Sequence, residues 1–211
     1  MTTALLQTTY FGPVQWYQKL ARYDHCLIEQ YDSYQKQTYR NRCVIATANG
    51  LQALTVPVEH ANKQPTANSQ LIKDLRISDH NQWRRVHWNA LQSAYSESPF
   101  FEYYADDIRP FFEQRYDYLI DFNEAIRQKM CELIDIYPKV DYTTEYLPTL
   151  NTQHSTQHDF REVIHAKHPL PDANFQPRPY WQVFQHRYGF QSNLSILDLL
   201  FCMGPESIFY L

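Results

Sequence analysis

The residues with the clearest chemical potential lie between Tyr34 and Arg42. This segment reads Tyr-Gln-Lys-Gln-Thr-Tyr-Arg-Asn-Arg, and its cations are Lys36, Arg40 and Arg42. The chain as a whole is acidic, with a formal net charge of -4, so the cluster runs against the background. Arginine presents a planar fork of N–H donors that suits phosphate and carboxylate groups. The segment is therefore predicted to bind an anion, and the alternative is a loop whose charges are solvated.

A histidine is the second group that could do chemistry. Imidazole exchanges a proton near neutral pH, and His87 lies on a predicted helix that also carries Arg84 and Arg85. We take His87 as the candidate general base. The alternative is a histidine that packs at the edge of an aromatic core.

Metal and nucleotide motifs are absent from the sequence. His154 and His158 stand four residues apart, but the Ser-Thr-Gln between them lacks the glutamate of the HExxH zinc motif. His165 and His168 add little support for a metal site, because Pro169 disfavours a helix at His168. No glycine-rich phosphate loop and no GxSxG nucleophile motif occurs. We expect no metal and no cofactor.

Composition indicates the kind of framework that positions these groups. The chain has 211 residues, of which 44% are hydrophobic and 20% charged, as in an ordinary globular domain. Its 17 Tyr and 12 Phe against only 4 Gly predict a largely aromatic core. The slight negative charge argues against general nucleic-acid binding. The absence of a secretory signal and of any 18-residue apolar run predicts a cytoplasmic protein without integral membrane contact.

The four cysteines fit that compartment. No two of them have a CxxC spacing, and each lies in an apolar run. They are therefore predicted to be buried free thiols. The cysteines are Cys26, Cys43, Cys131 and Cys202.

The first 77 residues are predicted to supply most of a sheet. A strand over residues 4–9, a helix over 13–23 that begins at Pro13, and a strand over 25–29 form a βαβ unit with parallel strands. Strands over 42–47 and 51–58 form a hairpin around Asn49-Gly50, with the end of the second strand at an edge because of Pro57. Residues 60–70 are predicted to be a loop and residues 71–77 a further strand.

The rest of the chain is predicted to be mainly helical. Helices are expected after a cap at Ser78 or Asp79, over 107–114 and over 118–134. A strand over 142–147 and a polar, loop-rich insert at about 148–179 follow. A helix over 180–188 and another over 194–203, capped by Asn193, end the chain. The prediction is one α/β domain over residues 1–211, in which helices cover a mixed sheet, with α+β as the alternative.

Several of these segments together resemble a known family. They recur in the same order in the WbqC-like bacterial proteins, and the resemblance covers nearly the whole chain. The opening differs, because Thr8-Thr9-Tyr10-Phe11-Gly12-Pro13 stands where better-known members have a Gln-Pro-Tyr-Phe-Phe-Pro type run. The segments are Tyr10 to Pro13, Tyr34 to Arg42, Asn49-Gly50, Leu54 to Val58, Trp83 to His87, Tyr95 to Phe101, and Asn193 through Gly204.

The resemblance implies a role in surface-polysaccharide (O-antigen) biosynthesis, where a glycine-transferase activity has been suggested for the family. We therefore expect an acyl- or aminoacyl-transferase acting on a sugar or nucleotide sugar, with an activated acyl donor as the other small-molecule partner. His87 would be the base and Asn41 would donate to the oxyanion. Anion or substrate binding would fall to Lys36, Arg40, Arg42, Gln35, Tyr10 and Tyr95.

Two alternatives stay open. The opening βαβ unit is reminiscent of nucleotidylyltransferases, although their HxGH signature does not occur here. A non-catalytic protein could use the same basic segment to hold a glycan or a nucleotide.

Overall fold

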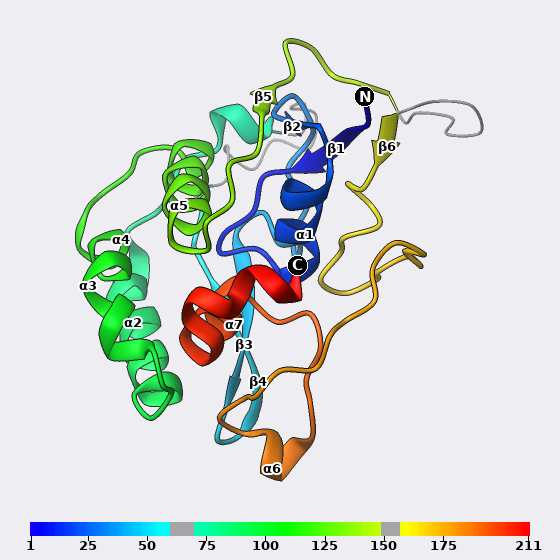
Figure 1. Ribbon diagram of the computed structural model, residues 1–211. Coiled ribbons are helices and arrows are strands. Elements are labelled where there is room, and N and C mark those ends of the chain that lie inside the picture. The colour runs from blue at the N-terminus through cyan, green and yellow to red at the C-terminus, as the bar shows by residue number, and fades with distance from the viewer. Residues whose placement is uncertain (60–69, 149–156) are drawn as a thin grey trace.

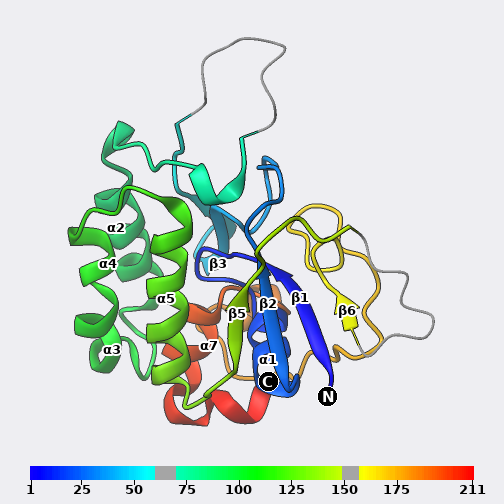
Figure 2. The same cartoon turned by 90° about the horizontal axis from the view of Figure 1, so that it is seen from above.

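In the part of the chain that the structure describes, the main sheet is parallel and has four strands. The computed structural model describes residues 1–59, 70–148 and 157–211, and Figures 1 and 2 show it from two directions. The strand order is β5-β2-β1-β6. The bounds are β1 Thr3–Gln7, β2 His25–Glu29, β5 Val140–Tyr142 and β6 Gln157–Asp159. Thr3 lies opposite His25 on one side and Gln157 on the other, so β1 is an interior strand.

The predicted βαβ unit is confirmed. Helix α1 (Val14–Arg22) connects the parallel strands β1 and β2, and Pro13 before it is extended (φ -70°, ψ 160°). The N–H of Gln15 donates to Oδ1 of Asn193 at 2.9 Å. A distant part of the chain therefore satisfies one of the free N–H groups at the start of α1.

The predicted hairpin is also confirmed. Strands β3 (Arg42–Thr47) and β4 (Gly50–Thr55) are antiparallel, and Gly50 has a φ of 98°. The hairpin extends away from the parallel sheet toward α6 (Gln185–Tyr188) (Figure 1). There Arg187 and Tyr188 both donate to the carbonyl of Ala48 at the hairpin tip, at 2.7 and 2.8 Å.

Most of the helices lie beside the β5 edge of the sheet. Figure 2 shows α5 next to β5, with α2, α3 and α4 beyond it. Their bounds are α2 Trp83–Tyr95, α3 Phe101–Ile108, α4 Pro110–Glu113 and α5 Leu119–Leu133. The predicted helix over 107–114 is thus two helices, because α3 ends at Ile108 and Pro110 begins α4.

The end of the chain returns to the start of α1. Helix α7 (Ile196–Met203) is followed by the 3₁₀ segment η4 (Gly204–Tyr210). The N–H of Val14 donates to the carbonyl of Leu194 at 3.0 Å. None of the helices in the described part of the chain has the length and apolar character needed to span a bilayer.

The fold is α/β, as predicted. Parallel and antiparallel strand pairs are both present, although in the described residues they form two separate sheets. Strands β5 and β6 come from beyond residue 77, and of these two only β6 was not predicted from the sequence. The core is rich in aromatic rings, and Tyr10 contacts Phe11 and Phe122 with centroids 5.1 and 5.7 Å apart.

The predicted strand over residues 71–77 is wrong. A short 3₁₀ turn, η1 (Ile72–Asp74), occupies its centre. The backbone hydrogen bonds go to several segments, with Lys73 N–H donating to the Gln30 carbonyl and Ser78 N–H to the Pro57 carbonyl. A continuous strand cannot form where successive residues bond to different partners.

Four other elements end earlier than predicted or are shorter. The strand expected to reach residue 9 ends at Gln7, and the hairpin strand expected to reach residue 58 ends at Thr55. The strand expected over 142–147 is β5, which ends at Tyr142, and the helix expected over 180–188 is only α6. The phenol of Tyr180 and the amide of Gln182 both donate to Oδ2 of Asp198, at 2.7 and 2.8 Å. These buried bonds hold residues 180–182 outside a helix.

The predicted helix caps are wrong as well. Ser195 caps α7 through its hydroxyl, which accepts from Leu197 N–H at 3.4 Å, whereas Asn193 bonds to Gln15. Neither Ser78 nor Asp79 caps α2, which is preceded by the 3₁₀ turn η2 (His80–Gln82).

The two predicted loops are only partly described. Residues 60–69 lie outside the described residues, and so do 149–156, which include His154. The described remainder of the 148–179 insert contains β6 and coil. The cysteine prediction is confirmed, because all four are buried and free.

Candidate functional site

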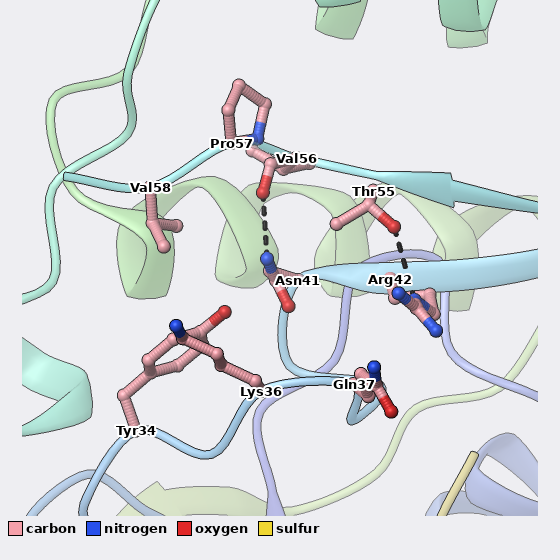
Figure 3. A pocket seen from close by; sticks show the side chains of 9 residues that line it. All are labelled: Tyr34, Lys36, Gln37, Asn41, Arg42, Thr55, Val56, Pro57 and Val58. Carbon is pink, nitrogen blue, oxygen red and sulfur yellow. Dashed lines mark hydrogen bonds between the residues drawn. The ribbon is translucent and has the colours of Figure 1, made fainter. Parts of the chain in front are cut away.

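A pocket of about 360 Å³ opens between the base of the hairpin and the segment that precedes it (Figure 3). One wall is the predicted anion-binding segment, and the other is the end of β4 with the three residues that follow. The two walls meet because Arg42 lies opposite Thr55 in the hairpin. The lining residues are Tyr34, Lys36, Gln37, Asn41, Arg42, Thr55, Val56, Pro57 and Val58.

Asn41 joins the two walls. Its carbonyl accepts from the N–H of Val56 at 2.8 Å, and its Nδ2 donates to the carbonyl of Val56 at 2.8 Å (Figure 3). The residue is buried. These bonds connect the two walls of the pocket, and the role of the Asn41 amide as an oxyanion donor stays a prediction.

Two cations line the pocket. Lys36 is exposed and Arg42 is partly buried. Arg42 Nε donates to Oγ1 of Thr55 at 3.1 Å, which fixes the guanidinium at the pocket wall. Among the described residues, no carboxylate lies within ion-pair distance of either cation. The pocket therefore carries positive charge that the described part of the chain does not neutralise at close range.

Tyr34 lines the pocket together with the two cations. Burial raises the pKa of its phenol, and the hydrogen bond with the Asn41 side chain and the charges of Arg42 and Arg40 act in the opposite direction. The phenol therefore stays neutral at pH 7.

Arg40 lies between these cations in the sequence but does not line the pocket. Its side chain is 1% exposed and forms an ion pair with Asp32. Burial lowers the pKa of Arg40, and the charge of Asp32 opposes that shift. Arg40 is thus an internal arginine held by a carboxylate, while its Nη1 has no partner in the described residues.

His87 is enclosed behind the pocket wall and does not line the pocket. Its Nδ1 lies 2.9 Å from the hydroxyl of Tyr10, and it also bonds to the backbone of Thr55. Burial lowers the pKa of His87 to about 4, against the weaker effect of the Thr55 bond. The imidazole is neutral at pH 7 and supports the end of β4, and its role as a base stays a prediction.

The remaining predicted residues lie apart from the pocket. Tyr10 is fully buried beside His87, and burial raises its pKa well above the ordinary value. The hydroxyl of Tyr95 donates to Oδ1 of Asp198 at 2.9 Å in the core. Gln35 belongs to the basic segment but is not one of the lining residues; it is exposed, and its carbonyl accepts from Oγ1 of Thr38 at 2.9 Å.

No metal centre stands out in the parts of the chain with described coordinates. No group of three or more histidine, cysteine, aspartate or glutamate side chains there could hold an ion. The rings of His165 and His168 are 5.8 Å apart and belong to no such group.

Comparison with known proteins gives the family. Residues 7–210 match the WbqC-like protein family. The chain belongs to that family. It is 28% identical to the uncharacterized protein Rv1507c of Mycobacterium tuberculosis (strain ATCC 25618 / H37Rv), in an alignment that covers 99% of this chain and 96% of the relative. No solved structure matches the chain.

The sequence of this WbqC-like protein predicts one wall of the pocket and not the other. It predicts Thr55 and Val56 to Val58 as hairpin residues and not as site residues. A signal was available, because a tight turn at Asn49-Gly50 fixes the register that brings Thr55 opposite Arg42.

Proposed function

We propose that the pocket binds the phosphate of a nucleotide sugar and that the protein transfers an acyl or aminoacyl group to this sugar in surface-polysaccharide biosynthesis. One observation supports the binding step. Lys36 and Arg42 line the same pocket, and neither has a carboxylate partner in the described residues. The sugar and the transfer reaction come from the resemblance to the WbqC-like family.

Lys36 and Arg42 bring two positive charges to one pocket. Asp32 compensates the charge of Arg40, whereas no described carboxylate lies within ion-pair distance of Lys36 or Arg42. A phosphate in the pocket would accept a charge-assisted hydrogen bond, worth roughly 1.5–3 kcal/mol, from either cation that it contacts. Tyr34 and Gln37 are further polar residues in the lining of the pocket.

The reaction needs an attacking group and a base. In acyl transfer, an amine or hydroxyl of the sugar forms a bond to the acyl carbonyl carbon, the bond to the leaving group breaks, and a base takes the proton. The base assigned from the sequence, His87, is 4% exposed and lies outside the pocket lining. This observation favours a second candidate, a non-catalytic protein that holds the nucleotide sugar for another enzyme.

Thermal-shift measurements test the binding step. UDP-N-acetylglucosamine should raise the melting temperature of the wild type, and Arg42→Ala should weaken its binding roughly tenfold or more. The matched control is Arg85→Ala, which removes one exposed positive charge from α2 outside the pocket. Equal losses in both variants would mean that general charge, and not the pocket, attracts the ligand.

Mass spectrometry tests the transfer step. The protein is incubated with the nucleotide sugar and an activated acyl or aminoacyl donor, and an acylated sugar is the expected product. Binding that depends on Arg42 without any product from a panel of donors would support the non-catalytic reading.

A further inference from the structure

One end of the pocket between the hairpin and the basic segment is lined by an aromatic ring and an aliphatic side chain. Tyr34 and Val58 line the pocket there, and both are only partly buried, so each exposes some side-chain surface. Figure 3 shows these two side chains on one side of Asn41 and the Arg42 side chain on the other. The pocket therefore has an apolar end and a basic end, and an anion at Arg42 alone would use only the basic end.

The backbone on both sides of the apolar end is held by one further segment, residues 70–78. On one side, the N–H of Tyr34 donates to the carbonyl of Gln70 at 2.9 Å. On the other side, Val58 forms an antiparallel bridge with Ile77. These contacts fix the separation of Tyr34 and Val58. Because the pocket between them is already open in the structure, a ligand can enter without a rearrangement of the backbone.

The size and the chemistry of the pocket limit what can occupy its apolar end. A volume of about 360 Å³ lies near the lower end of the range for small-molecule sites, so the pocket cannot enclose a long polyprenyl chain. A sugar carries several hydroxyl groups, and a tyrosine ring and a valine side chain leave most of these without hydrogen bonds. A nucleobase has flat faces that stack on tyrosine rings, which makes it the better fit.

We propose that the apolar end of the pocket binds the nucleobase of the nucleotide whose phosphate contacts Arg42. The base lies against the Tyr34 ring and the Val58 side chain. The ammonium group of Lys36 points to the same end and donates to an acceptor atom of the base (Figure 3).

This assignment rests on the proposed function, because it assumes a phosphate at Arg42. It adds that the pocket recognises the nucleoside part of the nucleotide sugar. In a nucleotide sugar the phosphates separate the base from the sugar, so the sugar lies beyond Arg42 and outside the apolar end.

Calorimetric titration with phosphates of graded structure tests the assignment. Ribose 5-phosphate is the reference, because UMP and AMP add only a base to it. At least one of these two nucleotides should bind the wild type roughly tenfold or more tightly than ribose 5-phosphate, as expected for one stacked base. N-acetylglucosamine 1-phosphate and farnesyl phosphate, which carry a sugar and a lipid in place of the nucleoside, should bind no more tightly than the reference.

Tyr34→Leu is the decisive variant, since it removes the ring and keeps an apolar side chain. It should weaken the binding of the preferred nucleotide roughly tenfold and leave the affinity for ribose 5-phosphate unchanged. Tyr34→Phe, which keeps the ring, should retain the preference for the nucleotide. Val58→Ala should reduce this preference as well, and it provides the same test if Tyr34→Leu does not fold.

Tyr31→Leu is the matched control. Tyr31 is a partly buried tyrosine three residues earlier in the chain, and it does not line the pocket. This variant should bind every ligand as the wild type does. Arg42→Ala should weaken ribose 5-phosphate and the nucleotide by similar factors, because both present a phosphate to the basic end.

Three results would overturn the inference. The first is that neither UMP nor AMP binds the wild type more tightly than ribose 5-phosphate. The second is a nucleotide preference that survives both Tyr34→Leu and Val58→Ala. The third is that the sugar phosphate or the lipid phosphate binds more tightly than both nucleotides, which would assign the apolar end to a sugar or to a lipid.

The same titrations separate this inference from the proposed phosphate site. In each of the three cases, binding of ribose 5-phosphate that depends on Arg42 would still support the phosphate site. If no phosphate compound binds, or if Arg42→Ala changes nothing, the phosphate site and the base site are both refuted.

Discussion

His87 gives the protein a specific dependence of stability on pH. Burial lowers its pKa from the ordinary 6.5 to about 4, so in the interval between these values the unfolded chain binds a proton that the folded chain does not. The free energy of unfolding should therefore fall as the pH drops through this window, while His87 adds no pH dependence above it. At about 1.36 kcal/mol for each pH unit, the loss amounts to roughly 3 kcal/mol by about pH 4.

Urea unfolding of the wild type and of His87→Gln, followed between about pH 8 and pH 4, isolates this effect. The variant should be less stable than the wild type near pH 8, because it loses a packed imidazole and the bond to Tyr10. The difference should shrink by roughly 3 kcal/mol toward pH 4. Tyr10→Phe is the control, since it removes the hydroxyl but keeps His87 buried, and it should retain the wild-type slope.

A constant difference between wild type and His87→Gln across the whole range would refute this reasoning. It would mean that the histidine titrates alike in the folded and unfolded chains. The role of His87 as a general base near neutral pH would then regain support, because a pKa of about 4 is what argues against it.

Three further outcomes are expected. Gly50→Val should destabilise by roughly 1 kcal/mol or more in thermal unfolding, because Gly50 has a φ of 98° and nothing lies within 4 Å of an added Cβ, so backbone strain alone acts; an unchanged midpoint would contradict it. Thiol titration without reductant should find four free thiols after unfolding and almost none before, because burial raises the pKa of both Cys26 and Cys43 to about 12; two or fewer after unfolding would count against it. Arg40→Ala should lower the unfolding free energy by roughly 3 kcal/mol, since it leaves Asp32 unpaired, and full stability of the variant would show that the pair is dispensable.

Local signals predicted the parts of the fold that depend on neighbours in sequence. Pro13 marks the start of α1, and Asn49-Gly50 marks the hairpin turn, because each restricts the backbone where it stands. Strand β6 carried no such signal. Its three residues are Gln-His-Asp, and they pair with β1 at the start of the chain.

The candidate site also has features that the sequence indicates and features that arise only from tertiary packing. The basic segment was visible in the sequence, but the separate environments of its three cations were not. Arg40 is buried against Asp32, while Lys36 and Arg42 line a pocket, and this difference depends on which side of the backbone each side chain occupies after folding. His87 lies on the predicted helix, but its enclosure by Tyr10 and Thr55 comes from tertiary packing.

The position of β6 also affects how the chain folds. During synthesis, β1, α1 and β2 emerge early and contain their own local contacts, whereas one side of β1 has no partner until residues 157–159 have been made. Pairings between distant residues form slowly, because a long loop must close first. Until then β1, which is buried at four of its five residues in the finished fold, offers an open strand edge to other chains. The nascent protein should therefore depend on chaperones during this interval more than its final stability would suggest.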